Sequence, residues 1–234
     1  MYTIHRRVGY SQLTPDWRLS LTALLDLFQD CGTFHGEDAG LGLAAMDARG
    51  QRWLLSRWRI KFLSPLPGLG EPISVGTQAY SCRMSMLNRR YWLRGTGGAL
   101  VAEGDALWVL CDKASQKPIP AASGCDIYLE PADFPPLDGL PRRLPAVENG
   151  RELPSFSVTA EMLDTNRHCN NVRAIGLCAR YLPADFTFSG FAADYHRQLP
   201  AGASVTPLLW ETGGCVTVSL FVNGSVCVTA AFLR

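Results

Sequence analysis

The chain has 234 residues, which is enough for one large domain or two small ones with a sizeable core. Hydrophobic residues make up 47% of the chain and charged residues 18%, a globular composition that excludes a disordered protein. A net charge of +1 gives no global attraction to nucleic acid or to a membrane, and no apolar run approaches the ~20 residues of a transmembrane helix.

The first half of the chain predicts a strand, a helix and then several strands. Residues 2–8 alternate in polarity, and apolar residues recur at helical spacing over 19–32. The glycine-rich run GLGLAA, residues 40–45, predicts a turn. Alternation then predicts further strands, with a Gly-rich turn at 95–98 between the last two: residues 57–62, 71–82, 88–96 and 99–111.

A change of composition separates the two halves. Residues 126–152 contain five prolines and six acidic residues and show no periodicity, which indicates a linker. We therefore predict a first domain at residues 1–125 and a second at residues 153–234.

The second half repeats the order of the first. It predicts a strand over 155–161, a helix over 170–182 and then four strands, the last two joined by an Asn-Gly hairpin turn: residues 188–198, 204–212, 214–222 and 224–233. A long helix lying across a curved antiparallel sheet buries the apolar face of both. The repeat thus predicts an α+β protein of two such units in tandem.

The eight cysteines form no C-x-x-C pair and lie mostly in apolar runs, so we expect small buried side chains in a reducing, cytoplasmic setting. The N-terminus lacks the apolar core of a signal peptide. No pair of histidines has metal-ligand spacing, so neither a metal nor a cofactor is expected. His35 is interpreted as a residue at the end of the first helix.

The densest group of polar side chains is LDTNRHCNN, residues 163–171. It holds one carboxylate, one imidazole, three amides and a thiol. Aligning the two halves by hand places residues 14–22, TPDWRLSLT, opposite it, and these contain neither His nor Asn. The fold itself therefore does not demand the group, which indicates a functional site.

The alternative interpretation of this segment is a helix N-cap by Asn170 or Asn171. A cap explains one asparagine. It leaves Asp164, Asn166 and His168, at alternating positions, without a purpose. No G-x-S-x-G motif occurs in the chain, so the serine nucleophile of an α/β-hydrolase is not expected.

This motif resembles the D-x-N-x-H-x-N-N signature of the acyl-ACP thioesterases, enzymes with two tandem hotdog domains. Three segments of the first half are also similar to that family: LLDLFQDCGTFHGEDAGLG (24–42), WLLSRWRIKFLSPLPGLGEPISVGT (53–77) and NRRYWLRGTGGALVAEGDALWVLCDKASQKPIP (88–120). The resemblance implies a double hotdog fold with the acyl-chain pocket in the first domain. It also implies hydrolysis of acyl-acyl carrier protein to a free fatty acid, as in fatty acid biosynthesis.

The resemblance implies catalytic roles for Asp164, Asn166 and His168. The family also has a glutamate in a following strand, and there this chain reads DYHRQL, with Gln198 in place of the glutamate. Hydrolysis needs a base for water, donors for the oxyanion and a proton for the thiolate. We expect the aspartate, asparagine and histidine to supply the first and last, with backbone amides at the helix N-terminus as donors.

Two alternatives stay open. An acyl-CoA is a related substrate, and because glutamine cannot act as a base, Gln198 is also compatible with a non-catalytic acyl-binding module. The expected partner is acyl carrier protein with its phosphopantetheine-linked acyl chain, with no nucleic acid and no membrane; a homodimer stays open. Three pairs of arginines, which are otherwise solvated surface, are candidates for docking this acidic partner: Arg6-Arg7, Arg89-Arg90 and Arg142-Arg143.

Overall fold

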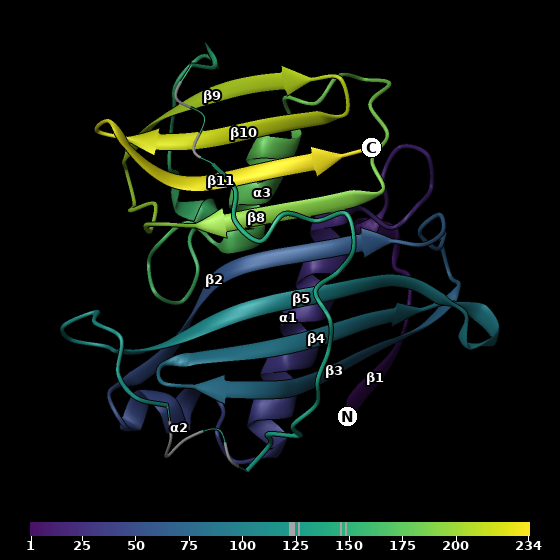
Figure 1. Ribbon diagram of the computed structural model, residues 1–234, viewed down its shortest axis with the longest axis vertical. Helices are drawn as coiled ribbons and strands as arrows, with labels where there is room; N and C mark the ends of the chain where they lie inside the picture. The colour runs from purple at the N-terminus through teal and green to yellow at the C-terminus, as the bar shows by residue number, and fades with distance from the viewer. Residues whose placement is uncertain (122–124, 126, 146, 148) are drawn as a thin grey trace. The chain divides into compact units, whose positions relative to one another are not determined.

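The computed structural model describes residues 1–121, 125, 127–145, 147 and 149–234. The chain divides into two compact units, each an α+β arrangement as predicted (Figure 1). The first unit comprises Met1–Ser56 and Ile60–Leu137, and the second comprises Arg57–Arg59 and Asp138–Arg234. The division at 137/138 falls inside the predicted linker 126–152, of which residues 126, 146 and 148 lie outside the described residues.

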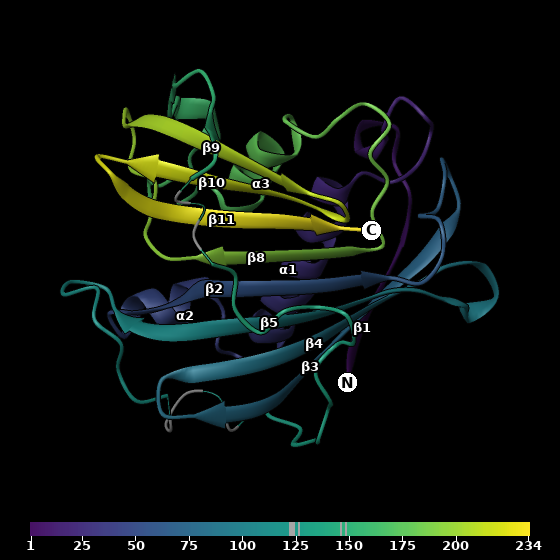
Figure 2. The same cartoon turned by 45° about the horizontal axis from the view of Figure 1, so that its top comes forward.

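The first unit is an antiparallel sheet with a long helix across it. Its strands follow the order β1-β3-β4-β5-β2, and in Figures 1 and 2 α1 runs across the back of this sheet. The elements are β1 (Tyr2–Arg7), α1 (Leu21–Asp38), α2 (Leu43–Ala48), β2 (Gln51–Phe62), β3 (Pro72–Arg83), β4 (Met86–Arg94) and β5 (Leu100–Asp112), with 3-10 turns at Tyr10–Gln12 and Thr96–Gly98.

Helix α1 is longer than the predicted 19–32. It begins after Ser20, whose Oγ accepts the Ala23 N–H at 3.1 Å, and it continues to Asp38. Gly32 lies inside it for a packing reason, because a Cβ there would stand 2.6 Å from the hydroxyl of Tyr91 on β4. Glycine therefore lets the helix approach the sheet closely. Residues 43–48, expected in part as a turn, form the short helix α2, capped by Gly42.

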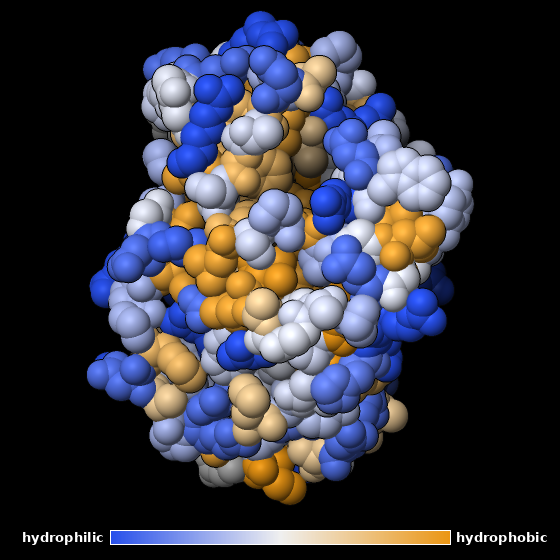
Figure 3. Space-filling view, turned by 90° about the vertical axis from the view of Figure 1, so that its right-hand side faces the viewer, coloured by the Kyte–Doolittle hydropathy of each residue, from blue (hydrophilic) through white to orange (hydrophobic). Residues whose placement is uncertain are grey.

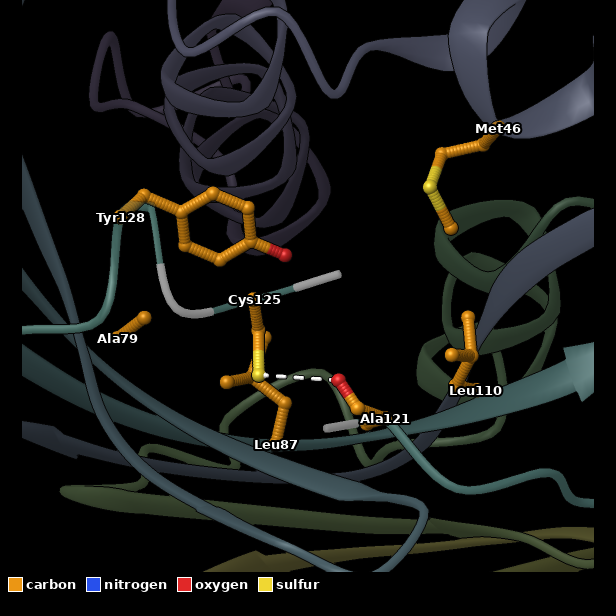
Figure 4. Packing of buried hydrophobic residues seen from close by; sticks show 7 residues of the cluster. All are labelled: Met46, Ala79, Leu87, Leu110, Ala121, Cys125 and Tyr128. Atoms are coloured by element: carbon orange, nitrogen blue, oxygen red, sulfur yellow. Dashed lines mark hydrogen bonds between the residues drawn. The ribbon is translucent and has the colours of Figure 1, made fainter. Parts of the chain in front are cut away.

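One hydrophobic cluster of the first unit joins α2, the sheet and the segment that follows the sheet (Figure 4). Met46 comes from α2 and Leu110 from β5, while Tyr128 comes from the proline-rich segment after the sheet. The thiol of Cys125 donates to the Ala121 carbonyl at 3.5 Å. Part of the predicted linker thus contributes to a core.

The second unit repeats this plan with shorter elements. Its strands follow the order β8-β11-β10-β9-β6, β7 also pairs with β9, and α3 packs against β10 and β11 (Figure 1). The elements are β6 (Arg151–Glu152), β7 (Phe156–Ser157), α3 (Asn171–Ala179), β8 (Gly190–Tyr195), β9 (Ser204–Thr212), β10 (Cys215–Val222) and β11 (Ser225–Leu233), with a 3-10 turn at Ala160–Met162.

The Asn-Gly hairpin turn is confirmed, because Asn223 and Gly224 both have positive φ, at 50° and 72°. The strand predicted over 155–161 is wrong beyond Ser157, since the chain there forms β7 and then a 3-10 turn. The strand predicted over 188–198 ends early, at Tyr195, because His196 and Arg197 both donate their N–H to the Cys227 carbonyl, at 2.8 and 3.1 Å. That doubled bond is a bulge that ends the pairing.

A buried ion pair holds the second unit to the end of the proline-rich segment. Arg59, 5% exposed, pairs with Asp194 at 2.7 Å and donates to the carbonyls of Pro141 and Arg142 at 2.5 and 3.0 Å. The second oxygen of Asp194 accepts the Leu144 N–H at 2.7 Å. These bonds explain why Arg57–Arg59 group with the second unit.

The surface is mixed in polarity. On the face drawn in Figure 3, patches of hydrophobic residues interrupt the hydrophilic ones. Trp17, which is 63% exposed, lies at the tip of the loop formed by residues 13–19 of the first unit. Among the described residues no helix is both long and apolar enough to cross a membrane.

Candidate active site

The motif forms a closed loop directly before α3. The Asp164 N–H donates to the His168 carbonyl at 2.8 Å, and the Arg167 N–H donates back to the Asp164 carbonyl at 3.0 Å. Leu163 and Cys169 pair at the base of the loop, and residues 165–167 are exposed at its tip. The chain therefore presents the polar side chains on a fixed turn.

Asp164 holds this loop with one carboxylate oxygen. Its Oδ1 accepts the N–H of Asn166 at 2.8 Å and that of His168 at 3.3 Å. Aspartate favours such turns because its short side chain bonds the backbone two residues on. Its Oδ2 has no hydrogen-bond partner in the part of the chain that the structure describes, so it can bind water or substrate.

The imidazole of His168 is partly buried and incompletely bonded. Its Nδ1 is inaccessible to solvent and has no hydrogen-bond partner among the described residues. A buried polar atom without a partner costs about 1–3 kcal/mol, so its survival in a fold points to a ligand or to chemistry. The ring is thus a candidate base that the protein leaves partly unbonded.

Backbone pairing brings Gln198 beside the loop. The Cys169 N–H donates to the Leu199 carbonyl at 2.9 Å, and His168 forms a β-bridge with Pro200. Gln198 precedes these two residues and is half-buried. It lies in the segment after β8 rather than in the strand that the sequence predicted. The four predicted residues, Asp164, Asn166, His168 and Gln198, thus lie on two segments that hydrogen-bond to each other.

Asn170 is the N-cap of α3, as the alternative interpretation of the motif proposed. Its Oδ1 accepts the N–H groups of Val172 and Arg173 at 2.8 and 3.3 Å. Two of the backbone N–H groups that were expected to face the substrate are therefore already hydrogen-bonded to Asn170. Of the first three helix residues, only Asn171 has an N–H without a partner within the described ranges. Of the backbone N–H groups expected to serve as oxyanion donors at the start of α3, only that of Asn171 is left for this role.

The thiol of the motif, Cys169, is poorly suited to act as a nucleophile. Burial raises the pKa of Cys169 to about 11, with a further rise from the negative charge of Asp164. The side chain is therefore a neutral thiol at physiological pH, and a neutral thiol attacks carbonyl carbon poorly. The arrangement favours attack by water over a covalent cysteine intermediate.

The first unit contains the same loop with different side chains, at residues 13–19. The Thr14 N–H donates to the Arg18 carbonyl at 2.7 Å, and the Trp17 N–H donates to the Thr14 carbonyl at 3.0 Å. Trp17 has a φ of 63° and Arg167 a φ of 62°. Thr14 Oγ1 also accepts the Arg18 N–H at 3.4 Å, as the carboxylate does in the second unit.

This match corrects the alignment made from sequence. Leu13 pairs with Leu19 as Leu163 pairs with Cys169, so the hand alignment to residues 14–22 was one residue out of register. Residues 13–21 also contain neither His nor Asn, so the inference from the alignment stands. The loop belongs to the fold, whereas its imidazole and amides belong to the second unit alone.

Sequence reasoning missed a buried polar group under α1. Arg89 and Arg90, interpreted as a surface pair, are each 4% exposed, so they cannot dock a partner. Arg89 Nη1 lies 3.0 Å from His35 Nδ1 and donates to Thr77 Oγ1 at 3.4 Å. Burial, followed by the charge of Arg89, lowers the pKa of His35 to about 4, so the ring is neutral.

The outward-facing arginine is covered by the proline-rich segment. Arg90 lies 3.5 Å from Asp105 and donates to the Pro135 carbonyl at 2.6 Å, with its guanidinium 5.0 Å from the centre of the Phe134 ring. Alternation along β4 sends Arg89 and Arg90 to opposite faces. The sequence does not show what covers the outer face of β4, so it does not show that both arginines are buried.

Each of the eight cysteines is a thiol rather than part of a disulfide. Among the described residues no group of three or more His, Cys, Asp or Glu side chains is arranged to hold a metal ion.

Residues 3–124 match the model of the N-terminal domain of acyl-ACP thioesterases. Two solved structures have the same fold: an acyl-ACP thioesterase from Bacteroides thetaiotaomicron (20% identity, TM-score 0.88, covering 99% of this chain and 96% of that one) and a 12:0-ACP thioesterase from Umbellularia californica (16% identity, TM-score 0.87, 99% and 96%). No curated protein sequence matches the chain. The predicted double hotdog fold is confirmed.

Proposed function

The chain belongs to the acyl-ACP thioesterase family and is a thioester hydrolase, and from this premise we propose that it releases free fatty acids from acyl carrier protein. The family implies an acyl chain carried on the phosphopantetheine arm of that protein. The alternative carrier is coenzyme A, which presents the same arm. The acyl-chain pocket in residues 1–125 and the cytoplasmic location stay predictions.

The observation that carries the proposal is that two loops with the same backbone hydrogen bonds carry different side chains. Residues 163–169 and 13–19 share their hydrogen bonds, but only the second unit has Asp164, Asn166 and His168. The loop forms in the first unit without these three side chains, which supports a chemical role for them in the second. We therefore assign one active site per chain, in the second unit.

In the proposed reaction, water attacks the carbonyl carbon of the thioester. His168 takes the proton as the new carbon–oxygen bond forms, because an imidazole can both accept and return a proton. The carbon–sulfur bond then breaks, and His168 returns the proton to the departing sulfur. The Oδ2 of Asp164 orients the attacking water, and the carboxylate charge stabilises the imidazolium that forms.

The negative charge on the carbonyl oxygen needs donors. We assign this role to the Asn171 N–H at the start of α3 and to the side-chain amide of Asn166. Gln198 contributes a hydrogen bond rather than proton transfer, because its amide has donors and an acceptor but no titratable proton.

Incubating the purified protein with acyl carrier proteins of several acyl chain lengths, with free thiol as the readout, tests the proposal. We expect thiol release above the rate of acyl-ACP alone for at least one chain length. Binding of acyl-ACP without thiol release at any length would instead support the acyl-binding module that Gln198 leaves open.

A further inference from the structure

Three arginines of the second unit lie beside the active-site loop. Arg167 is at the loop tip, next to His168, and Arg173 is in the first turn of α3. Arg197 precedes Gln198 in the segment whose Leu199 carbonyl accepts the Cys169 N–H at 2.9 Å. All three arginines are exposed. Two hydrogen-bonded segments and one helix start thus place three cations around one site.

Within the described residues, none of these three guanidinium groups forms an ion pair or a side-chain hydrogen bond. Arg59 of the same unit, by contrast, is enclosed by a carboxylate and carbonyl oxygens. The donors of the three arginines are therefore available to a ligand.

The sister loop shows that the backbone does not require basic residues at these positions. Trp17 stands where Arg167 does, and Ala23 follows its N-cap by three residues as Arg173 follows Asn170. The Leu19 N–H donates to the Pro67 carbonyl as the Cys169 N–H does to that of Leu199, so residues 197–198 correspond to 65–66, which read Pro, Leu. The positions of Arg167, Arg173 and Arg197 are thus basic only in the second unit, while the sister loop has its own arginine, Arg18, at the position of His168.

We propose that Arg167, Arg173 and Arg197 bind the phosphate of the phosphopantetheine arm while the thioester lies at His168. Arginine is suited to this ligand because its planar fork of N–H donors matches phosphate oxygens. This inference rests on the proposed function and adds how the carrier is recognised.

The test compares two small substrates that differ by one phosphate. The same acyl group is presented as the thioester of pantetheine and as the thioester of 4′-phosphopantetheine, and kcat/KM is measured for each. We expect wild type to prefer the phosphorylated substrate. Each of Arg167→Gln, Arg173→Gln and Arg197→Gln should reduce that preference about two- to fivefold, the upper part of the range for loss of an exposed charge pair. The triple variant should leave almost no preference.

Arg143→Gln is the matched control, because Arg143 is also an exposed arginine of the second unit but lies outside these segments. It should keep the wild-type preference. The proposal would be overturned if wild type hydrolysed the two small substrates with equal kcat/KM. It would also be overturned if the triple variant kept the wild-type preference for the phosphorylated substrate. A triple-variant defect confined to acyl-ACP would overturn it as well, since the arginines would then contact the carrier protein rather than the phosphate.

Failure of the proposed function has a different signature, in which wild type hydrolyses neither small thioester nor acyl-ACP. In that case calorimetric titration with free 4′-phosphopantetheine and with pantetheine decides the arginine proposal separately. Tighter binding of the phosphorylated compound by wild type, lost in the triple variant, supports it. Equal affinities for the two compounds contradict it.

Discussion

At the scale of the residue, Asp164 has two separable roles. Its Oδ1 holds the loop through two backbone N–H groups, while Oδ2 is left for the reaction. In the first unit the hydroxyl of Thr14 provides part of the loop-holding role, so a carboxylate is not needed for the shape. The charge of Asp164 is therefore the feature to remove in an experiment.

Asp164→Asn tests that separation. The amide oxygen of asparagine accepts the same backbone N–H groups, so we expect the melting temperature to change little. Loss of the charge that stabilises the imidazolium should lower kcat/KM by at least ~10². The measurements are thermal unfolding and thiol release from acyl-ACP. A matching fall in stability would show that the residue is structural instead.

Gln198→Glu tests whether the family's glutamate is indispensable. Asp164 and His168 already supply a charge and a base, and Gln198 lies outside the strand, beside the loop. We expect the rate on acyl-ACP to change by less than about tenfold between pH 6 and 9, since either side chain can hydrogen-bond a water. A wild type near background, with a large gain in the variant, would identify a degenerate binding module.

At the scale of the element, the helices predicted over 19–32 and 170–182 are present as α1 and α3, whereas α2 and the buried arginines were not predicted. The buried face of α1 follows from apolar spacing, whereas its start after the N-cap Ser20 is a finding of the structure. The burial of Arg90 depends on Phe134 and Pro135, which approach β4 only in the folded chain. Alternating polarity identifies the two faces of a strand but not what covers them.

The candidate site, too, was predictable from the sequence only in part. The polar group at 163–171 is visible in sequence, and its function is inferred from contrast with the sister repeat. The capping of Val172 and Arg173 by Asn170 is one of the two caps that the sequence allowed, and the structure selects it. The bulge that ends β8 before Gln198 is set by hydrogen bonds that no spacing of residue types reveals.

Helix α1 carries a pH-dependent contribution to stability. His35 has a pKa lowered to about 4 in the folded protein, against an ordinary value of 6.5. The unfolded chain therefore binds a proton that the folded one does not, and stability falls as the pH decreases from 6.5 towards 4. We expect His35→Gln to flatten the dependence of the urea midpoint on pH across that window.

The control for that prediction is His5→Gln, since His5 is an exposed residue of β1 in the same unit. It should leave the slope of the urea midpoint against pH as it is in wild type. A wild-type slope retained by His35→Gln would show that other groups cause the loss of stability in acid.

At the scale of the whole molecule, the proposal is that an acidic carrier protein delivers the substrate. Attraction between exposed charges is screened by salt, because the Debye length falls from about 10 Å at 0.1 M to about 3 Å at 1 M. We expect kcat/KM on acyl-ACP to exceed that on acyl-CoA and to fall steeply with added salt. Salt-insensitive turnover, or a strong preference for acyl-CoA, would count against the carrier protein.

The central claim is that the second unit alone carries the chemistry, and two histidine variants test it most directly. Both should be assayed for thiol release from the preferred acyl-ACP, with folding checked by circular dichroism. His168→Ala should lower the rate by about 10²–10⁴, the range for losing a positioned general base. His35→Gln, which alters the buried group under α1, should cost far less. Equal losses from the two variants would contradict the claim.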